Sequence, residues 1–123
     1  MDLKSILDEI IRINGVTSVA LVGGDGFVIE SVSAEGTTAD LDFLGGVASS
    51  SRASSEALAE FFGKGPVSQV MIDFEEGPVL LTPLSQDGDK YDVLATLDST
   101  QNLGRVRFQL KKYLPRLLEA ARA

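Results

Sequence analysis

Three glycines and an aspartate stand between two apolar runs near the start of the chain, in the stretch SVALVGGDGFVIES from Ser18 to Ser31. A glycine-rich loop after a strand can bind phosphate when a helix follows it, because the first N–H groups of that helix then face the anion. Here the run FVIESV follows, which is typical of a strand, and no lysine of the Walker type is present. We therefore predict a tight β-turn rather than a nucleotide site, with Gly24, Asp25 and Gly26 at positive φ angles.

Few other residues offer catalytic or metal-binding chemistry. The 123 residues include no histidine and no cysteine, which excludes Ser–His–Asp triads, Cys–His pairs, zinc sites of the usual ligands and disulfides. Asp87, Asp89 and Asp92 lie close together in sequence, but their spacing does not fit an EF-hand loop, and we favour a turn over a calcium site. No pair of carboxylates stands out for acid–base catalysis. We expect a protein that is not an enzyme and that uses no cofactor or metal.

Charge is distributed unevenly along the chain. From Arg105 onward there are six basic residues and one acidic residue, net +5, whereas the preceding part has five basic and seventeen acidic residues, net −12. The acidic part disfavours nucleic-acid binding, because it repels phosphate. The basic end is either a set of solvated residues on a terminal helix or a surface that meets an acidic partner.

Hydropathy predicts no membrane segment. No apolar run approaches the roughly 20 residues that span a bilayer. The start, MDLKSILDEIIRI, carries acidic residues and lacks the basic region and cleavage site of a signal peptide. We expect a cytoplasmic protein without membrane contacts, and the length suits one domain over residues 1–123.

The first predicted element is a helix over residues 2–14. Its leucines and isoleucines recur at helical spacing, and charged residues occupy the other side. Asp2 or a neighbour can cap the first turn, and Gly15 is placed to end the helix.

Five apolar segments separated by turn residues are predicted to be strands. Their ranges are 17–22, 27–32, 67–74, 79–84 and 91–97. The first two form a hairpin and the last three an antiparallel meander. In the last strand, alternate residues from Tyr91 to Leu97 form one dominant buried face.

The middle helix is rich in small residues. It is predicted to run from Leu41 to Phe62, after a loop at 36–39 and a cap at Thr38 or Asp40. Its larger apolar residues can face a core; they are Leu44, Val47, Ala48, Leu58, Phe61 and Phe62. A stripe of small residues at steps of four, three and four consists of Gly46, Ser50, Ala53 and Ala57. Each glycine inside a helix costs about 1 kcal/mol relative to alanine. Close approach of another backbone would compensate, either from the protein's own sheet or from a helix of a second subunit.

A final helix is predicted to run from Ser99 or Thr100, one of which caps it, toward the C-terminus. Pro115 lies inside its apolar pattern and should kink the helix or weaken its last turns. Gly104 lies near its start, and we expect the backbone to lie close to another segment there.

The element order α-β-β-α-β-β-β-α predicts an α+β fold, a three-layer α/β/α sandwich in which helices cover both faces of one five-stranded antiparallel sheet. This order, with SVALVGGDGFVIES near the start and NLGRVRFQLKKYL near the end, resembles the roadblock (dynein light chain) family over about Leu3 to Leu118. The resemblance implies a homodimer or heterodimer in which the middle helices lie together and the third strands pair edge to edge. The dimer interface that we expect on this basis consists of Gly46, Ser50, Ala53, Ala57, Val70, Met71, Ile72 and Phe74.

The function that the resemblance implies is regulatory. Members of the family bind small GTPases or motor components, and some bacterial members act as GTPase-activating or nucleotide-exchange partners. We expect a homodimer whose partner is a Ras-like small GTPase, and the nucleotide belongs to that partner because this chain lacks a Walker lysine motif. The alternative is a structural scaffold or assembly module without effect on nucleotide turnover.

The partner-binding platform is expected on the middle helix, with the terminal helices on the opposite face of the sheet. Its expected residues are Ser49, Arg52, Ser55 and Glu56. Arg52 is the one arginine of this helix. We favour an exposed charge or a partner contact over a trans-acting arginine finger, because nothing local positions it.

Overall fold

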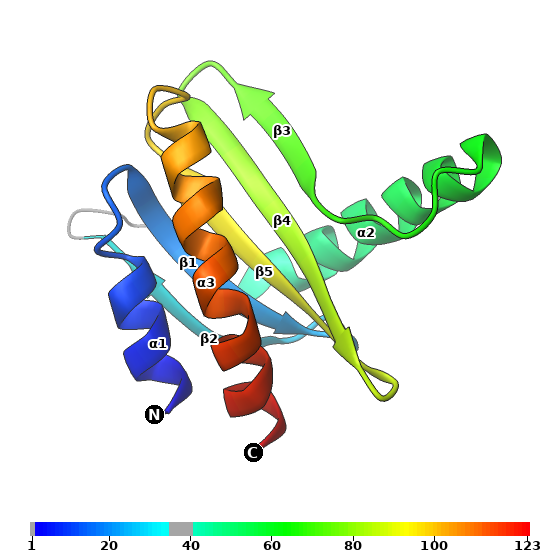
Figure 1. Ribbon diagram of the computed structural model, residues 1–123, viewed down its shortest axis with the longest axis horizontal. Coiled ribbons are helices and arrows are strands. Elements are labelled where there is room, and N and C mark those ends of the chain that lie inside the picture. The colour runs from blue at the N-terminus through cyan, green and yellow to red at the C-terminus, as the bar shows by residue number, and fades with distance from the viewer. Residues whose placement is uncertain (1, 35–40) are drawn as a thin grey trace.

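The computed structural model describes residues 2–34 and 41–123 (Figure 1), and the predicted loop at 36–39 and the predicted caps Thr38 and Asp40 lie outside these residues. The helices are α1 (Leu3–Ile10), α2 (Leu44–Phe62) and α3 (Leu103–Arg122), with a short 3-10 turn, η1 (Leu41–Phe43), before α2. The strands are β1 (Val16–Gly23), β2 (Val28–Ser33), β3 (Val70–Phe74), β4 (Gly77–Gln86) and β5 (Asp89–Leu97).

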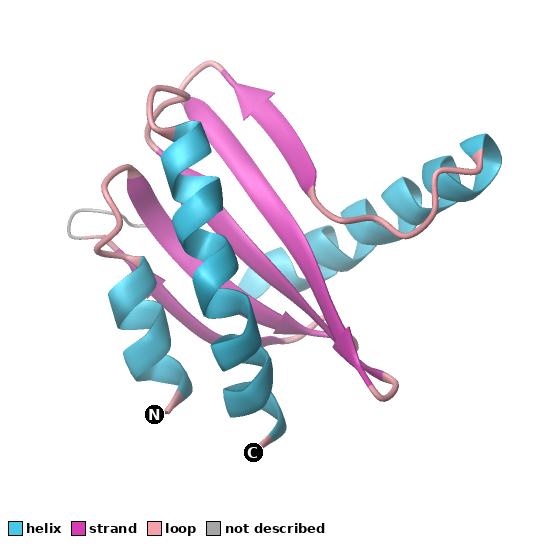
Figure 2. Ribbon diagram, viewed as in Figure 1, coloured by secondary structure: helices cyan, strands magenta, loops and turns pink. Residues whose placement is uncertain are grey.

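The five strands form one antiparallel sheet in the order β2-β1-β5-β4-β3, so β2 and β3 are its edges. α1 and α3 cover one face and α2 lies against the other, as Figures 1 and 2 show. The predicted three-layer α+β fold is therefore confirmed. None of the helices in the described ranges is long and apolar enough to cross a bilayer.

The two faces of the sheet bury different amounts of apolar surface. The core beneath α1 and α3 is large, and its fully buried members include Leu7, Leu21, Leu80, Leu110 and Leu117. The buried core beneath α2 is small and consists of Ala20, Val22, Ala48, Leu81 and Leu94. Because each fully buried leucine contributes about 1.5–3 kcal/mol, most of the hydrophobic stabilisation lies on the α1–α3 side.

α1 begins at its predicted cap and ends earlier than predicted. The Asp2 Oδ1 accepts a hydrogen bond from the Ser5 N–H at 2.8 Å, and this bond lowers the pKa of the Asp2 carboxyl. The helix ends at Ile10, so the prediction that Gly15 terminates it is wrong. Gly15 has a φ angle of +102° and leads from the intervening turn into β1.

The start of α3 is not capped as predicted. Its N-cap is Asn102, which makes no side-chain capping hydrogen bond, so the predicted cap at Ser99 or Thr100 is wrong. The Ser99 hydroxyl instead accepts a hydrogen bond from the Gln101 N–H within the preceding turn.

α3 continues through Pro115 to Arg122. The proline lies on the exposed side of the helix, where water can satisfy the carbonyl that it leaves without a donor. The close approach expected at Gly104 is wrong, because no atom of another described segment lies within 4 Å of the position that a Cβ would take there.

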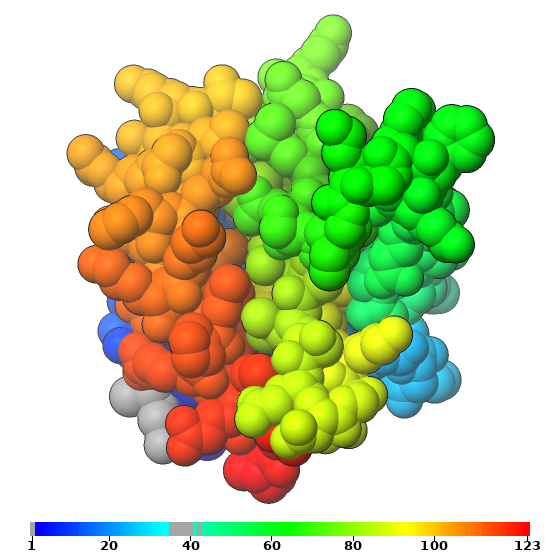
Figure 3. All heavy atoms as spheres, turned by 45° about the vertical axis from the view of Figure 1, so that its right-hand side comes forward, coloured from blue at the N-terminus to red at the C-terminus, as the bar shows by residue number. Residues whose placement is uncertain are grey.

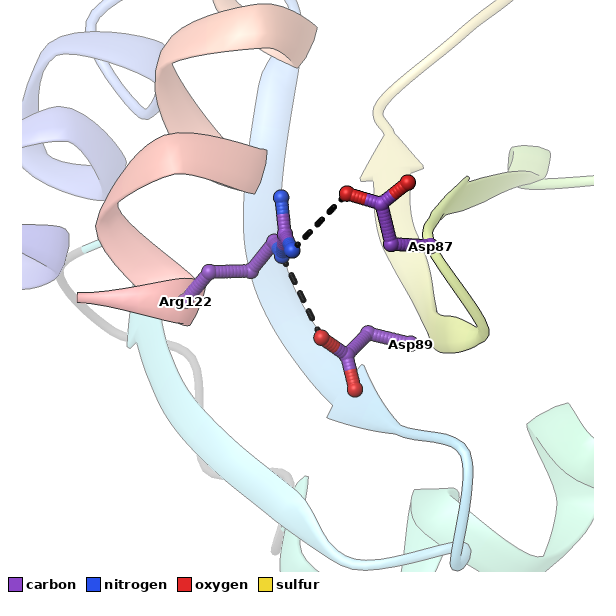
Figure 4. A network of polar contacts seen from close by, with 3 residues as sticks. All are labelled: Asp87, Asp89 and Arg122. Carbon is purple, nitrogen blue, oxygen red and sulfur yellow. Dashed lines mark hydrogen bonds and ion pairs between the residues drawn. The ribbon is translucent and has the colours of Figure 1, made fainter.

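The β4–β5 hairpin contains the predicted acidic turn. The two residues between the strands, Asp87 and Gly88, have φ angles of 52° and 88°, which a two-residue type I′ turn requires. Asp87 and Asp89 both contact Arg122 near the end of α3 (Figure 4). Asp92 contacts α2 instead, so the three carboxylates are separated and the turn prediction is confirmed.

Candidate functional site

The glycine-rich stretch forms the β1–β2 hairpin turn that the sequence predicts. Gly26 has a φ angle of +87° and its N–H donates to the Gly23 carbonyl at 3.0 Å. Gly24 and Asp25 do not have positive φ angles, so that part of the prediction is wrong. The Asp25 carboxylate instead accepts the Phe27 N–H and stabilises the turn. β2 follows the turn directly, so the loop does not lead into a helix as a phosphate-binding loop does.

The hairpin turn also lies directly against the first turn of α2. A Cβ at Gly45 would lie 1.8 Å from the Gly26 carbonyl oxygen, so only glycine fits at that position. A Cβ at the neighbouring Gly46 would have no atom within 4 Å. The protein's own hairpin therefore explains Gly45, while Gly46 is left without a contact in the described chain.

α2 extends beyond the sheet that it covers. Ala48, near its start, is 2% exposed, but the C-terminal half of the helix projects past the strands (Figure 1). Four of the six residues predicted to face a core are exposed, and that prediction is wrong for Val47, Leu58, Phe61 and Phe62. Helical periodicity indicates an apolar side of a helix, but it does not indicate which surface covers that side.

An apolar groove of about 200 Å³ opens between α2 and the β3 edge of the sheet. Its lining includes Leu44, Val47, Val70, Ile72 and Phe74. β3 begins at Val70 rather than at 67, and three of its side chains are more than two-fifths exposed, namely Met71, Ile72 and Phe74. Edge strands with exposed apolar side chains are prone to pair with another chain.

An ion pair connects the middle of α2 to β5. The Arg52 Nη1 lies 3.2 Å from the Asp92 Oδ2, and the Arg52 Nε lies 3.6 Å from the Glu56 Oε1. The side chain of Arg52 is 12% exposed and that of Asp92 is 0% exposed. The expectation that Arg52 is an exposed charge is therefore wrong, because a buried carboxylate on the sheet holds its guanidinium.

The Asp92 carboxylate lies in an unfavourable environment for a charge. Neither oxygen has a hydrogen-bonding partner among the described residues, so the contact with Arg52 is an ion pair without hydrogen-bond alignment. Burial raises the pKa of the Asp92 carboxyl, the Arg52 guanidinium lowers it, and the Glu56 carboxylate raises it again. The pair was missed from sequence because polar residues in an alternating strand usually face solvent, whereas α2 covers this face.

The other residues predicted to bind the partner or the second subunit also lie on α2. The Ser55 hydroxyl donates to the Ser51 carbonyl of the same helix, the Ser49 Oγ is buried, and Glu56 is exposed. The small-residue stripe is exposed along its whole length; it consists of Gly46, Ser50, Ala53 and Ala57. The stripe lies on the side of α2 that faces away from the sheet, and Met71 of β3 lies on the sheet face opposite α2, so the structure does not bring all the predicted interface residues together. Their roles stay predictions.

Comparisons with known proteins agree with this fold. Residues 3–88 match the Roadblock/LC7 domain family. The chain is 30% identical over 110 residues to the uncharacterized protein MJ0714 of Methanocaldococcus jannaschii, covering 89% of this chain and 88% of that protein.

Solved structures of low sequence identity share the architecture. The gliding protein MglB from Thermus thermophilus matches with a TM-score of 0.82 at 22% identity, covering 98% of this chain and 88% of that one. MglB of Myxococcus xanthus matches with a TM-score of 0.81 at 20% identity, covering 95% and 92%. These two likenesses show the shared fold, and the family match extends over more than half of the chain. The protein belongs to the Roadblock/LC7 domain family.

Proposed function

We propose that this protein is a homodimeric regulator that binds a Ras-like small GTPase and modulates its nucleotide cycle. The observation that carries the proposal is the apolar side of α2, which continues past the sheet that covers its first half. Membership of the roadblock family supports this class of function, because the resemblance implies binding to small GTPases.

One side of α2 needs a second surface to cover it. A stripe with steps of four and three runs along the helix and consists of Leu44, Ala48, Ser51, Ser55, Leu58 and Phe62. Ala48 at its beginning is buried on the sheet, whereas Leu58 and Phe62 at its end are 61% and 62% exposed. A second sheet that continued beyond β3 would lie under these exposed side chains.

β3 is the edge at which a second sheet can join. Val70, Ile72 and Phe74 line the groove beneath α2, and Met71, which pairs with Leu80 in register, lies on the opposite face. Antiparallel pairing of β3 with its own copy satisfies the free backbone groups of both edges and produces a closed two-fold contact. The exposed half of each α2 then lies over the strands of the other subunit, alongside the other α2.

The paired α2 helices form the platform on which the GTPase binds. The chain contributes no nucleotide site at its glycine turn, so the nucleotide belongs to the partner. Because Asp92 holds Arg52 against the sheet, we propose that the dimer acts by positioning the switch regions of the GTPase rather than by inserting an arginine.

Dimerisation is tested by replacing Leu58 with aspartate and measuring molar mass by light scattering. The charge would be buried under the partner's sheet, so L58D should be monomeric at concentrations where the wild type is a dimer. Phe108→Asp is the matched control, because Phe108 is 66% exposed on α3, on the other side of the sheet, and its replacement should leave the dimer intact. A wild-type protein that is monomeric at high concentration would contradict the proposal.

Partner binding is tested by calorimetric titration of a Ras-like GTPase from the same organism. The proposal predicts saturable binding by the wild type and weaker binding by L58D. Binding without any change in nucleotide hydrolysis or release would instead support the scaffold function. Absence of binding to the GTPase in both its GDP-bound and GTP-bound states would refute the regulatory role.

A further inference from the structure

α3 carries two kinds of basic residue. Arg116 contacts Glu9 at 2.8 Å, and Arg122 contacts Asp87 and Asp89 (Figure 4), so the C-terminal half of the helix is neutralised within the chain. The N-terminal half is different: its four cations are exposed and form no ion pair with any side chain that the structure describes. They are Arg105, Arg107, Lys111 and Lys112.

A small groove adjoins these cations. It has a volume of about 120 Å³ and lies between α3, Thr82 in the middle of β4, and the segment before β3. Figure 3 shows this side of the molecule, where the orange and red turns of α3 lie beside the yellow-green β4. The lining includes Gln69, Thr82, Arg107, Leu110, Lys111 and Leu114. The Gln69 amide donates to the Thr82 hydroxyl at 3.1 Å, so one wall is polar, while the half-buried Leu114 provides apolar surface beside the buried Leu110.

Phe108 adds an exposed aromatic ring to the same stretch of helix. Its side chain is 66% exposed, and the Lys112 Nζ lies 4.8 Å from the ring centroid. Aromatic and arginine side chains are enriched at protein interfaces relative to the rest of the surface. The combination of unpaired cations, an exposed ring and a groove distinguishes this surface from a merely solvated helix face.

We propose that this surface, which comprises Arg105, Arg107, Phe108, Lys111, Lys112 and the adjoining groove, binds an acidic peptide segment of a partner protein. Carboxylates of the peptide pair with the four cations, and one apolar side chain of the peptide enters the groove. Charge complementarity favours this occupant. The chain neutralises the cations at the end of α3, but the residues that the structure describes supply no carboxylate to those at its beginning.

An extended polyanion fits this surface less well than a short acidic segment. The part of the chain before Arg105 carries a net charge of −12, which repels a nucleic acid or an anionic membrane. A short peptide is screened from most of that charge, because the Debye length is about 8 Å at physiological ionic strength. The surface lies on the α1–α3 face, opposite α2, so this proposal goes beyond the proposed function and permits two partners at once.

The proposal is tested by probing the purified full chain with an array of short random peptides. Bound peptides should be enriched in aspartate and glutamate and should contain a large apolar residue. The best of them is then measured in solution by fluorescence anisotropy, where its affinity should fall as salt rises. The double variant Arg107→Glu/Lys111→Glu should lose about tenfold in affinity or more, because two attractions become repulsions.

Arg12→Glu is the matched control, since Arg12 is an exposed arginine outside the groove, and it should change the affinity by less than about twofold. Circular dichroism checks that each variant is folded. L58D should bind the peptide like the wild type, so that a failure of the dimer proposal can be distinguished from a failure of this one. An array without acidic enrichment, or a double variant within about twofold of the wild type, would overturn the inference. Tighter binding to poly(U) RNA or to phosphatidylserine vesicles than to the peptide would overturn it as well.

Discussion

Replacing Arg52 with methionine should destabilise the fold far more than replacing an exposed arginine, because it leaves the Asp92 carboxylate buried without a counter-charge. Asp92 is 0% exposed and has no hydrogen bond among the described residues. Removing one member of a buried ion pair costs about 3–5 kcal/mol. Two features reduce this cost: the Arg52 side chain is 12% exposed, and Asp92 can take up a proton. We therefore expect the free energy of unfolding to fall by about 2–4 kcal/mol at neutral pH.

The loss of stability in R52M should depend on pH. Burial raises the pKa of the Asp92 carboxyl in the folded protein. The protonated Asp92 therefore makes its full contribution to the free energy of unfolding below the unfolded-state pKa of about 3.9. This contribution is lost as pH rises through the folded-state pKa. Without Arg52 the folded pKa rises further, because the guanidinium is the group that lowers it. The difference between R52M and wild type should be small below about pH 4 and grow toward neutral pH.

The assay is thermal unfolding at fixed protein concentration between about pH 4 and 8 for R52M, D92N and the double variant. A loss of 3 kcal/mol corresponds to a fall in Tm of about 12 °C, given about 2.1 cal/mol/K of unfolding entropy per residue. The double variant should recover most of this loss, because no charge remains stranded. Arg105→Met, an exposed arginine of α3, should change stability by less than about 0.5 kcal/mol.

Two results would refute this reasoning. If R52M and R105M had the same Tm, the ion pair would contribute nothing. If the double variant were no more stable than R52M, the loss would come from packing of the arginine stem rather than from the stranded carboxylate.

Four glycine-to-alanine substitutions, in α2, α3 and the β4–β5 turn, provide further tests. Gly45→Ala should lower Tm sharply, because the new Cβ would lie 1.8 Å from the Gly26 carbonyl oxygen. Gly46→Ala has open space and should leave Tm nearly unchanged, but the proposed interface predicts that it weakens dimerisation in light scattering. Gly104→Ala should raise stability in urea unfolding by about 0.5–1 kcal/mol, since this helical position is exposed and free of neighbours. Gly88→Ala should lower stability by about 1 kcal/mol in the same assay, because its φ of +88° strains any L side chain although the space is open.

Local patterns were sufficient to predict the order of elements and the nature of the glycine loop. The residues after Gly26 have the composition of a strand, and this excluded the helix that a phosphate site needs. The cap at Asp2 and the turn at Asp87 likewise depend on side chains a few positions apart, so their structure can be inferred from short stretches.

Features that depend on distant segments could not be predicted in the same way. Leu58 and Phe62 continue a helical apolar side, but only the finite width of the sheet leaves them exposed. Arg52 and Asp92 are 40 positions apart and have no shared local pattern, so their pairing is evident only when α2 is placed over β5. Both differences lie in the candidate site: Leu58 and Phe62 lie on the surface where we propose that a second subunit binds, and Arg52 is removed from solvent.

GTP turnover by a Ras-like GTPase from the same organism is the most direct test of the central claim. Hydrolysis and the release of fluorescent GDP are measured with increasing amounts of the wild-type protein and of L58D. We predict that the wild type changes one of these rates saturably and that L58D loses the effect at concentrations where it is monomeric. Unchanged hydrolysis and unchanged nucleotide release at saturating wild-type protein would contradict the proposed function.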